Sequence, residues 1–247
     1  MWDKPEQLNI VANALYALGG LALVYVALWY VVHLPVFPLR EIRVLGAPSH
    51  VTRAQIADLA RTGLKGNFFT LNLRDARAAF EKLPWVRSVA VRRKWPDRLE
   101  VRLEEHVPLA RWGDAGLVNM QGEVFRAAYD GELPVFLGPP GSAKEIAIQY
   151  SFFRRALEPI GKKLAQVQVT PRRAWEIRLA GGTTIELGRE RVEERLSKFI
   201  AVYDRSLGRL QRRIDYVDLR YGNGFAVRIP GLDKATQQSG GLPHKRG

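Results

Sequence analysis

The chain has 247 residues, with 38 lysines and arginines against 25 aspartates and glutamates, a net charge of +13, and no cysteine. The lack of cysteine excludes disulfides, thiolate metal sites, iron–sulfur clusters and cysteine nucleophiles. With 47% apolar and 26% charged residues, the composition is that of a globular chain, and the length fits one large domain or two small ones.

A long apolar segment lies near the N-terminus. Residues Ile10 to Val32 contain no charged side chain, and as a helix they would extend about 34 Å, enough to cross a hydrocarbon core of about 30 Å. We therefore predict a membrane-spanning helix over residues 10–34, preceded by a short tail over residues 1–9. A cleaved signal peptide fits less well, because the segment is long, the residues before it are not basic and no small-residue cleavage site follows it.

The charges around this segment give a weak signal for its orientation. The flank before it is nearly neutral, whereas the flank after it carries Arg40, Arg43 and Arg53. Taken literally, the positive-inside rule would keep the following domain in the cytoplasm, but the rule weakens when a long domain is translocated.

The next residues predict a strand and a helix. Apolar and polar residues alternate from Leu39 to Gly46, the pattern of a strand that ends in a turn. Thr52, followed three residues later by Gln55, forms a capping box that opens a helix, and Gly63 ends this helix.

A second helix and a hairpin follow. Asn72 can cap the helix, and we expect Pro84 to terminate it. The alternating segments Val86–Arg92 and Leu99–Glu105 then predict two strands joined by the turn Lys94–Arg98. The order strand, helix, helix, strand, strand predicts a three-stranded sheet with both helices on one face.

From Val107 onward the pattern changes to short strands separated by turns. Leu133–Ser142 is rich in proline and glycine and predicts a loop, whereas helices are expected over Ala143–Leu164 and Arg191–Ser206. Residues 233–247 are polar, and we expect them to be disordered. The expected strands are Leu109–Trp112, Leu117–Asn119, Glu123–Phe125, Val167–Thr170, Ala174–Leu179, Thr183–Leu187, Tyr216–Tyr221 and Gly224–Ile229.

The sequence contains no recognisable catalytic or metal-binding motif. The four histidines do not show metal-ligand spacing, and no nucleophile elbow, phosphate loop or dinucleotide fingerprint occurs. Glu104 and Glu105 are adjacent in a strand and face opposite sides, so they cannot act as one acid and base pair. We therefore expect no enzymatic activity, no cofactor and no metal site.

The excess of basic residues allows three interpretations. It could bind nucleic acid, but the arginines of the hairpin also form the solvated face that such a sheet requires. It could instead face anionic lipid headgroups or acidic protein partners. It could also be a solvated surface with no specific ligand.

Four segments in chain order carry a family resemblance: Leu83–Pro108, Leu117–Phe125, Leu133–Ser142 and Val217–Val227. Together with the single apolar anchor they resemble the FtsQ/DivIB family of bacterial cell-division proteins, and the first section is similar to a POTRA domain. The resemblance implies an α+β fold: a single transmembrane helix, a POTRA domain over residues 37–106, and a second β-rich domain over residues 107–232 with a C-terminal edge strand. It also implies a single-pass inner-membrane protein at the division septum, with its N-terminus in the cytoplasm and its C-terminal domains in the periplasm.

The implied function is that of a non-enzymatic divisome scaffold. Members of the family recruit FtsB and FtsL through the distal domain and contact other division proteins through the transmembrane helix and the POTRA domain, and no nucleic-acid partner is expected. This chain departs from the family in its short N-terminus, since many members have a longer basic tail. Two alternatives remain: a POTRA-type chaperone for exported proteins, or an anchored binder of peptidoglycan or nucleic acid.

The resemblance also assigns a binding site. The family's binding strand falls on Arg220, Tyr221, Gly222, Asn223, Gly224 and Phe225, and a basic position on the preceding helix matches Arg195, with Arg191 as the alternative. We expect Arg220–Val227 to be an open edge to which a partner strand adds, with Tyr221 as the anchor and Arg220 bonded to a partner carboxylate. From the pattern alone, Tyr-Gly-Asn-Gly-Phe is more typical of a plain hairpin turn, and it is the family resemblance that favours a binding strand.

Overall fold

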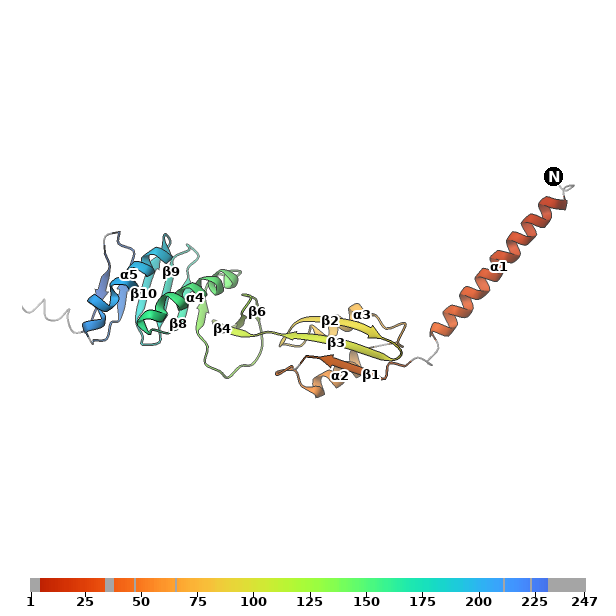
Figure 1. Cartoon of the computed structure of the whole chain (residues 1–247), viewed down its shortest axis with the longest axis horizontal. Helices are drawn as coiled ribbons and strands as arrows, with labels where there is room; N and C mark the ends of the chain where they lie inside the picture. The colour runs from red at the N-terminus through yellow and green to blue at the C-terminus, as the bar shows by residue number, and fades with distance from the viewer. Residues whose placement is uncertain are drawn as a thin grey trace, which may run out of the picture. The chain divides into compact units, whose positions relative to one another are not determined.

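The computed structural model describes residues 5–33, 38–46, 48–64, 66–210, 212–222 and 224–230. By its internal contacts the chain divides into two compact units, and the boundary in the sequence lies between Glu105 and His106. Figure 1 shows the elements of each unit in chain order. The C-terminal residues 233–247, which we expect to be disordered, lie outside the described residues.

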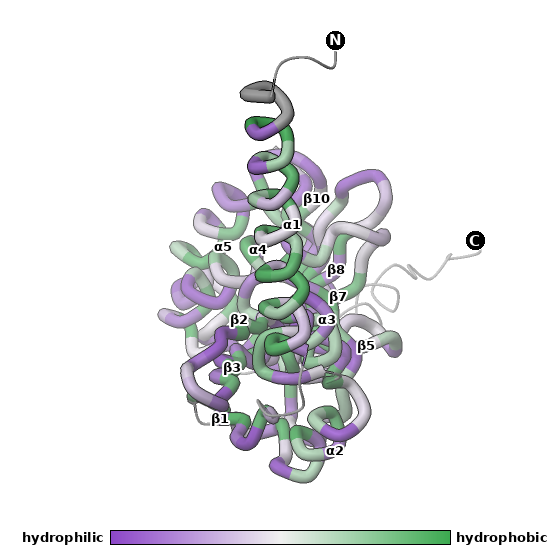
Figure 2. The backbone as a smooth tube through the Cα atoms, turned by 90° about the vertical axis from the view of Figure 1, so that its right-hand side faces the viewer, coloured by the Kyte–Doolittle hydropathy of each residue, from purple (hydrophilic) through white to green (hydrophobic). Residues whose placement is uncertain are grey.

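The first element is the long helix α1, Pro5–His33. Its segment Asn9–His33 contains a window of 18 residues with a mean hydropathy of 2.0, none of which is buried inside the structure, and Figure 2 shows how far apolar residues extend along the helix. By length and composition this helix could cross a membrane.

Beyond α1, the residues that the structure describes in the first unit form a three-stranded sheet with two helices. Its elements are β1 (Glu41–Leu45), α2 (Arg53–Gly63), α3 (Leu73–Phe80), β2 (Val86–Lys94) and β3 (Arg98–Glu105). The strand order is β1-β3-β2, with β1 parallel and β2 antiparallel to β3. This confirms the predicted β-α-α-β-β arrangement.

Local capping signals form these helices as expected, with one correction. The hydroxyl of Thr52 accepts from the Gln55 N–H at 3.2 Å, and Gln55 Oε1 accepts from the Thr52 N–H at 2.9 Å. Asn72 Oδ1 caps α3 by accepting from the Arg74 N–H. However, α3 ends at Phe80, four residues before Pro84, because Pro84 has no N–H to donate to the Phe80 carbonyl and its ring would clash with that carbonyl in a helix.

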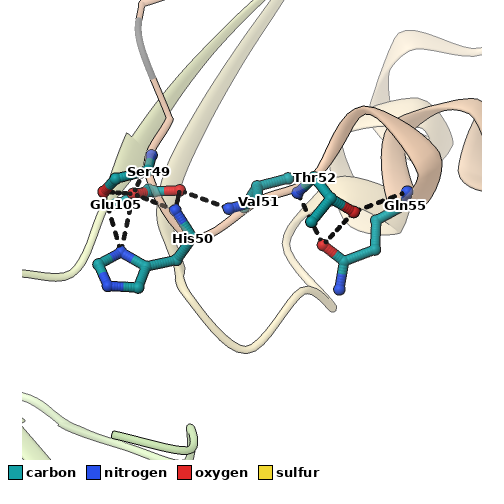
Figure 3. Close-up of polar contacts among 6 residues, drawn as sticks. All are labelled: Ser49, His50, Val51, Thr52, Gln55 and Glu105. Carbon is teal, nitrogen blue, oxygen red and sulfur yellow. Dashed lines mark hydrogen bonds and ion pairs between the residues drawn. The ribbon is translucent and has the colours of Figure 1, made fainter.

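A carboxylate fastens the loop between β1 and α2 to the end of β3 (Figure 3). Glu105 accepts from the backbone N–H groups of Ser49 (3.0 Å), His50 (3.0 Å) and Val51 (2.9 Å), and from the Ser49 hydroxyl (2.9 Å). Burial raises the pKa of this carboxyl, but the backbone hydrogen bonds outweigh it and lower the pKa to about 2. The Glu105 carboxylate therefore holds together two segments that lie more than 50 residues apart in sequence.

In the second unit, the described residues form a mixed sheet of nine strands, covered on one face by α4 (Ala143–Leu157) and α5 (Val192–Ser206). Its strand order is β12-β11-β10-β9-β8-β7-β4-β5-β6, so β12 and β6 are the edges. Short 3-10 turns follow the two helices, η1 (Glu158–Ile160) and η2 (Gly208–Leu210). The strands are β4 (Pro108–Trp112), β5 (Gly116–Asn119), β6 (Val124–Phe125), β7 (Val135–Leu137), β8 (Leu164–Val169), β9 (Trp175–Leu179), β10 (Thr184–Gly188), β11 (Tyr216–Asp218) and β12 (Ala226–Arg228).

Two expectations for this unit are wrong. The predicted loop Leu133–Ser142 contains β7, whose Phe136 is fully buried between the parallel neighbours β4 and β8. The predicted helix Ala143–Leu164 ends at Leu157, because Pro159 offers no N–H to continue it. Gly161, with φ +63°, then reverses the chain into β8.

Candidate partner-binding site

The connection from β11 to β12 forms one wall of a groove, and α5 forms the other. The groove has a volume of about 530 Å³. It brings together five of the residues assigned to the site from sequence, Arg195, Tyr221, Gly222, Gly224 and Phe225, together with the alternative Arg191. Asn223 lies outside the described residues. The lining residues are Arg191, Glu194, Arg195, Lys198, Phe199, Ala201, Val202, Leu219, Tyr221, Gly222, Gly224 and Phe225.

Two aromatic rings hold the connection against the helix. The ring of Phe225 meets that of Phe199 edge to face, with centroids 5.3 Å apart. Phe199 is buried on the core face of α5, and Phe225 is partly buried against the same core. Tyr221, in contrast, is 61% exposed at the mouth of the groove, so its ring is available to a partner.

The open edge beside this groove is β12, which requires a correction to the predicted site. β11 ends at Asp218 and β12 begins at Ala226, so Arg220–Val227 is not one edge strand. Tyr221, Gly222, Gly224 and Phe225 lie outside both strands and line the groove with α5, and the edge itself is Ala226–Arg228. β12 pairs with β11 on one side only, and no described strand pairs with its other side. The fold class, with its C-terminal edge strand, is confirmed.

Arg220 does not point at a vacant partner position, because its guanidinium is already bonded within the unit. Arg220 Nη2 lies 2.7 Å from Asp218 Oδ2, Nε lies 2.9 Å from Oδ1, and Nη1 lies 2.9 Å from Glu186 Oε1. The hydrogen bonds from Arg220 lower the pKa of Asp218, and this pairing raises the pKa of Arg220. Burial and a hydrogen bond to Glu186 raise the pKa of Tyr216 to about 12. This network of four residues ties β10 and β11 to the start of the connection.

The Arg195 side chain is bonded to the end of β10. Its Nη1 donates to the Leu187 carbonyl at 2.8 Å. A Cβ on Gly188 would lie 2.7 Å from Arg195 Nη1 and 3.1 Å from Arg220 Cγ, and Gly188 has φ +78°. The positive φ favours glycine there, and a larger residue would also have to displace the end of the Arg195 side chain.

Gly222 and Gly224 do not serve the packing of this unit. A Cβ added at either position would meet no atom within 4 Å. Gly222 also has an ordinary φ that other residues can adopt. A plain turn would use glycine for its left-handed conformation, so Gly222 gives no support to that interpretation, and both glycines leave room for a second backbone.

The rim of the groove on α5 is basic. Arg191 and Lys198 are exposed and share one acidic neighbour, Glu194, at 3.9 Å and 2.6 Å. Hydrogen bonding from Lys198 lowers the pKa of Glu194. With Arg195, the rim carries three cations against one carboxylate, which favours an acidic partner. Among the described residues, no cluster of three or more His, Asp or Glu is placed to hold a metal ion.

Comparison with known proteins identifies the family. Residues 37–106 match the model of the FtsQ-type POTRA domain, and residues 110–220 match the model of the C-terminal part of cell division protein FtsQ/DivIB. The chain belongs to the FtsQ/DivIB family. Its role is therefore in bacterial cell division, and with α1 the family indicates a divisome-associated, single-pass membrane protein.

Curated relatives extend this match over nearly the whole chain. The cell division protein FtsQ of Nitrosospira multiformis is 46% identical, covering 92% of this chain and 99% of the relative. The FtsQ of Burkholderia pseudomallei is 42% identical over 98% of this chain and 99% of the relative. That of Neisseria gonorrhoeae is 33% identical over 92% and 95%.

Sequence reasoning missed the residues that support the site. Glu186, Gly188 and Asp218 position the two arginines, and Lys198 adds to the rim. Of these residues, only Asp218 could have been predicted from the sequence. Asp218 and Arg220 are two residues apart, and side chains with this spacing lie on the same side of an extended chain. The others come from β10 and from the exposed face of α5.

Proposed function

We propose that this protein is a non-enzymatic divisome scaffold that recruits partners of the FtsB and FtsL type by strand addition to β12. The observation that carries the proposal is an open edge strand beside a groove whose lining combines apolar side chains with basic ones. A partner strand would gain backbone hydrogen bonds along Ala226–Arg228 and place a side chain in the groove. Both features lie at one end of the same sheet.

The side chains around the edge would supply selectivity. Tyr221 is a large aromatic at the mouth of the groove, of the kind that dominates binding energy at interfaces. Arg191, Arg195 and Lys198 would attract carboxylates of the incoming segment. Arg220 would act indirectly, by holding the connection to Asp218 and Glu186.

Binding of the full chain to the extracytoplasmic segments of FtsB and FtsL tests this proposal. Tyr221→Ala should weaken the complex about thirtyfold, which corresponds to about 2 kcal/mol. Ile148→Ala is a matched control, because Ile148 is an exposed apolar side chain on α4, outside the groove. Undiminished binding of Tyr221→Ala, or equal losses in both variants, would contradict the proposal.

We further propose that the N-terminus is cytoplasmic, that both folded units are periplasmic, and that the protein gathers at the division septum. Family membership and α1 support this orientation, against a weak charge signal. A C-terminal phosphatase reporter, active only after export, should be active, and a fluorescent fusion should concentrate at midcell. An inactive reporter would refute the proposed orientation, and uniform fluorescence around the envelope would refute the septal location.

Contacts with other division proteins through the transmembrane helix and the POTRA domain belong to the same proposal. A groove of about 810 Å³ between β1 and α2 supports the POTRA contact. Ile42 and Val44 on β1 and Ile56 on α2 line this groove and are only partly buried. The edge of β1 that no described strand pairs with therefore borders a groove with a mixed apolar and basic lining.

A further inference from the structure

One end of the POTRA domain is tied closely to the end of α1 by the covalent chain. Only five Cα-to-Cα steps separate His33 from Pro38, so these residues lie at most about 18 Å apart whatever path the intervening chain takes. Two residues further on, the N–H groups of Arg40 and Glu41 donate to the Asp97 carbonyl at 3.0 and 3.5 Å. The tip of the β2–β3 hairpin is thus fixed beside the residues that follow α1.

This tip carries a large apolar side chain without cover. Trp95 is 79% exposed, more than any other large apolar side chain outside α1 among the described residues. Arg93, two residues earlier, donates to the carbonyls of Phe69 and Leu71 and so holds a second loop at the same end. Phe69 in this loop is also an exposed aromatic.

Basic residues lie close to the exposed tryptophan in the chain, in a turn that also contains the acidic Asp97. Lys94 and Arg98 flank the turn, each about half exposed, and pair with Glu100 at 3.1 Å and Glu41 at 2.9 Å. Arg40 is exposed and has no ion-pair partner among the described residues. Aromatic rings within a rim of cations are typical of surfaces that enter the headgroup region of a bilayer.

We propose that the tip of the β2–β3 hairpin, centred on Trp95, inserts into the headgroup region of the membrane that α1 crosses and binds anionic phospholipid there. The indole would occupy the interface between headgroups and acyl chains, and the surrounding cations would contact lipid phosphates. Because the short chain between His33 and Pro38 already keeps this surface near the membrane, its binding there loses little further translational entropy. One end of the POTRA domain would thereby be held at the bilayer.

This inference depends on α1 crossing a membrane but not on its orientation. The hairpin tip lies next to the end of α1 on whichever side the domain resides. The proposed strand addition at β12 belongs to the other unit, so the two proposals can fail independently.

The full chain reconstituted in lipid nanodiscs tests the proposal. Because the protein has no cysteine, a single polarity-sensitive fluorophore can be attached through Lys94→Cys, beside an intact Trp95. Arg53→Cys provides the control position, since Arg53 begins α2 at the other end of β1, whose five residues span about 17 Å. Quenching by lipids that carry a nitroxide near the headgroup reports proximity to the interface.

The expected result is several-fold stronger quenching at position 94 than at position 53 in discs that contain phosphatidylglycerol. Trp95→Glu in the same labelled protein should abolish this difference, as should discs of phosphatidylcholine alone. Equal quenching at both positions would overturn the proposal. Strong quenching that survives Trp95→Glu would also overturn it, because the tether alone would then explain the proximity, and quenching independent of phosphatidylglycerol would overturn the anionic ligand.

Discussion

Replacing Glu105 by glutamine tests the physical account of the POTRA domain most sharply. The side chain is only 14% exposed, and its carboxylate accepts hydrogen bonds from three consecutive backbone N–H groups, those of Ser49, His50 and Val51. Glutamine has nearly the same shape but no charge, and only one of its two terminal atoms can accept. The substitution therefore removes the charge-assisted part of this interaction and leaves the volume unchanged.

The expected loss follows from the pKa of Glu105. A decrease in the pKa from the ordinary value of 4.5 to about 2 corresponds to at most about 3.5 kcal/mol, at about 1.4 kcal/mol per unit. Allowing for solvent screening and for the acceptor that glutamine retains, we expect a loss of about 2 kcal/mol. For a domain of this size, that lowers the melting temperature by roughly 10 °C.

Glu104→Gln is the matched control, because Glu104 is the neighbouring carboxylate on the opposite face of β3. It is half exposed and pairs with Arg87 and Ser88, so its neutralisation should cost well under 1 kcal/mol. Thermal unfolding of the full chain, with hydrogen exchange of the 49–51 amides, measures both effects. Equal melting temperatures for the two variants, or unchanged exchange of these amides in Glu105→Gln, would refute the reasoning.

Three further predictions follow from the geometry. Because the folded-state pKa of Glu105 is depressed, its stabilisation is complete above pH 4.5 and is lost as the pH falls toward about 2; the difference in melting temperature between wild type and Glu105→Gln should shrink over this range, and a constant difference would contradict the linkage. Arg220→Glu should destabilise the second unit by about 2 kcal/mol, since it leaves a nearly buried carboxylate unpaired, whereas Tyr221→Ala should leave the melting temperature unchanged; equal melting curves for the two variants would disprove the distinction. Gly188→Ala should cost about 1 kcal/mol or more and displace Arg195, given its positive φ and the 2.7 Å approach; wild-type stability and binding of this variant would show that the close approach has no consequence.

The parts of the fold that sequence predicts well depend on signals between residues close in the chain. The capping box of Thr52 and Gln55, the Asn72 cap and the hairpin of β2 and β3 each involve positions within a few residues of one another. They form as expected because local hydrogen bonds and alternation suffice to determine them.

The secondary structure was predicted wrongly where it depends on residues that are distant in the sequence. β7 has only three residues between proline and glycine, and it becomes a strand because β4 and β8 pair with both of its sides. Pro159 indicates the end of α4. The helix was nevertheless predicted to continue, because apolar residues of η1 and β8 follow Pro159 with a spacing that resembles a helix face. Periodicity alone does not distinguish these cases.

In the candidate site too, some residues could be placed from the sequence, whereas the contacts between distant residues could not. Family resemblance placed Tyr221, Gly222, Gly224 and Phe225 on what the structure shows to be one wall of the groove, and Arg195 on the other. The partners of Arg220 could not be predicted, because Glu186 comes beside it only through the parallel pairing of β10 with β11. Arg220, which the resemblance assigns to partner binding, is therefore bonded within the unit to Asp218 and Glu186.

Hydrogen exchange along β12 tests the central claim most directly. The full chain would be measured alone and in complex with the extracytoplasmic segments of FtsB and FtsL. Strand addition predicts new protection of the Ala226–Arg228 amides on binding, together with protection of the connection around Tyr221, while the opposite edge strand β6 stays unchanged. Binding that leaves the β12 amides as exchangeable as in the free protein would contradict the claim and place the partner elsewhere.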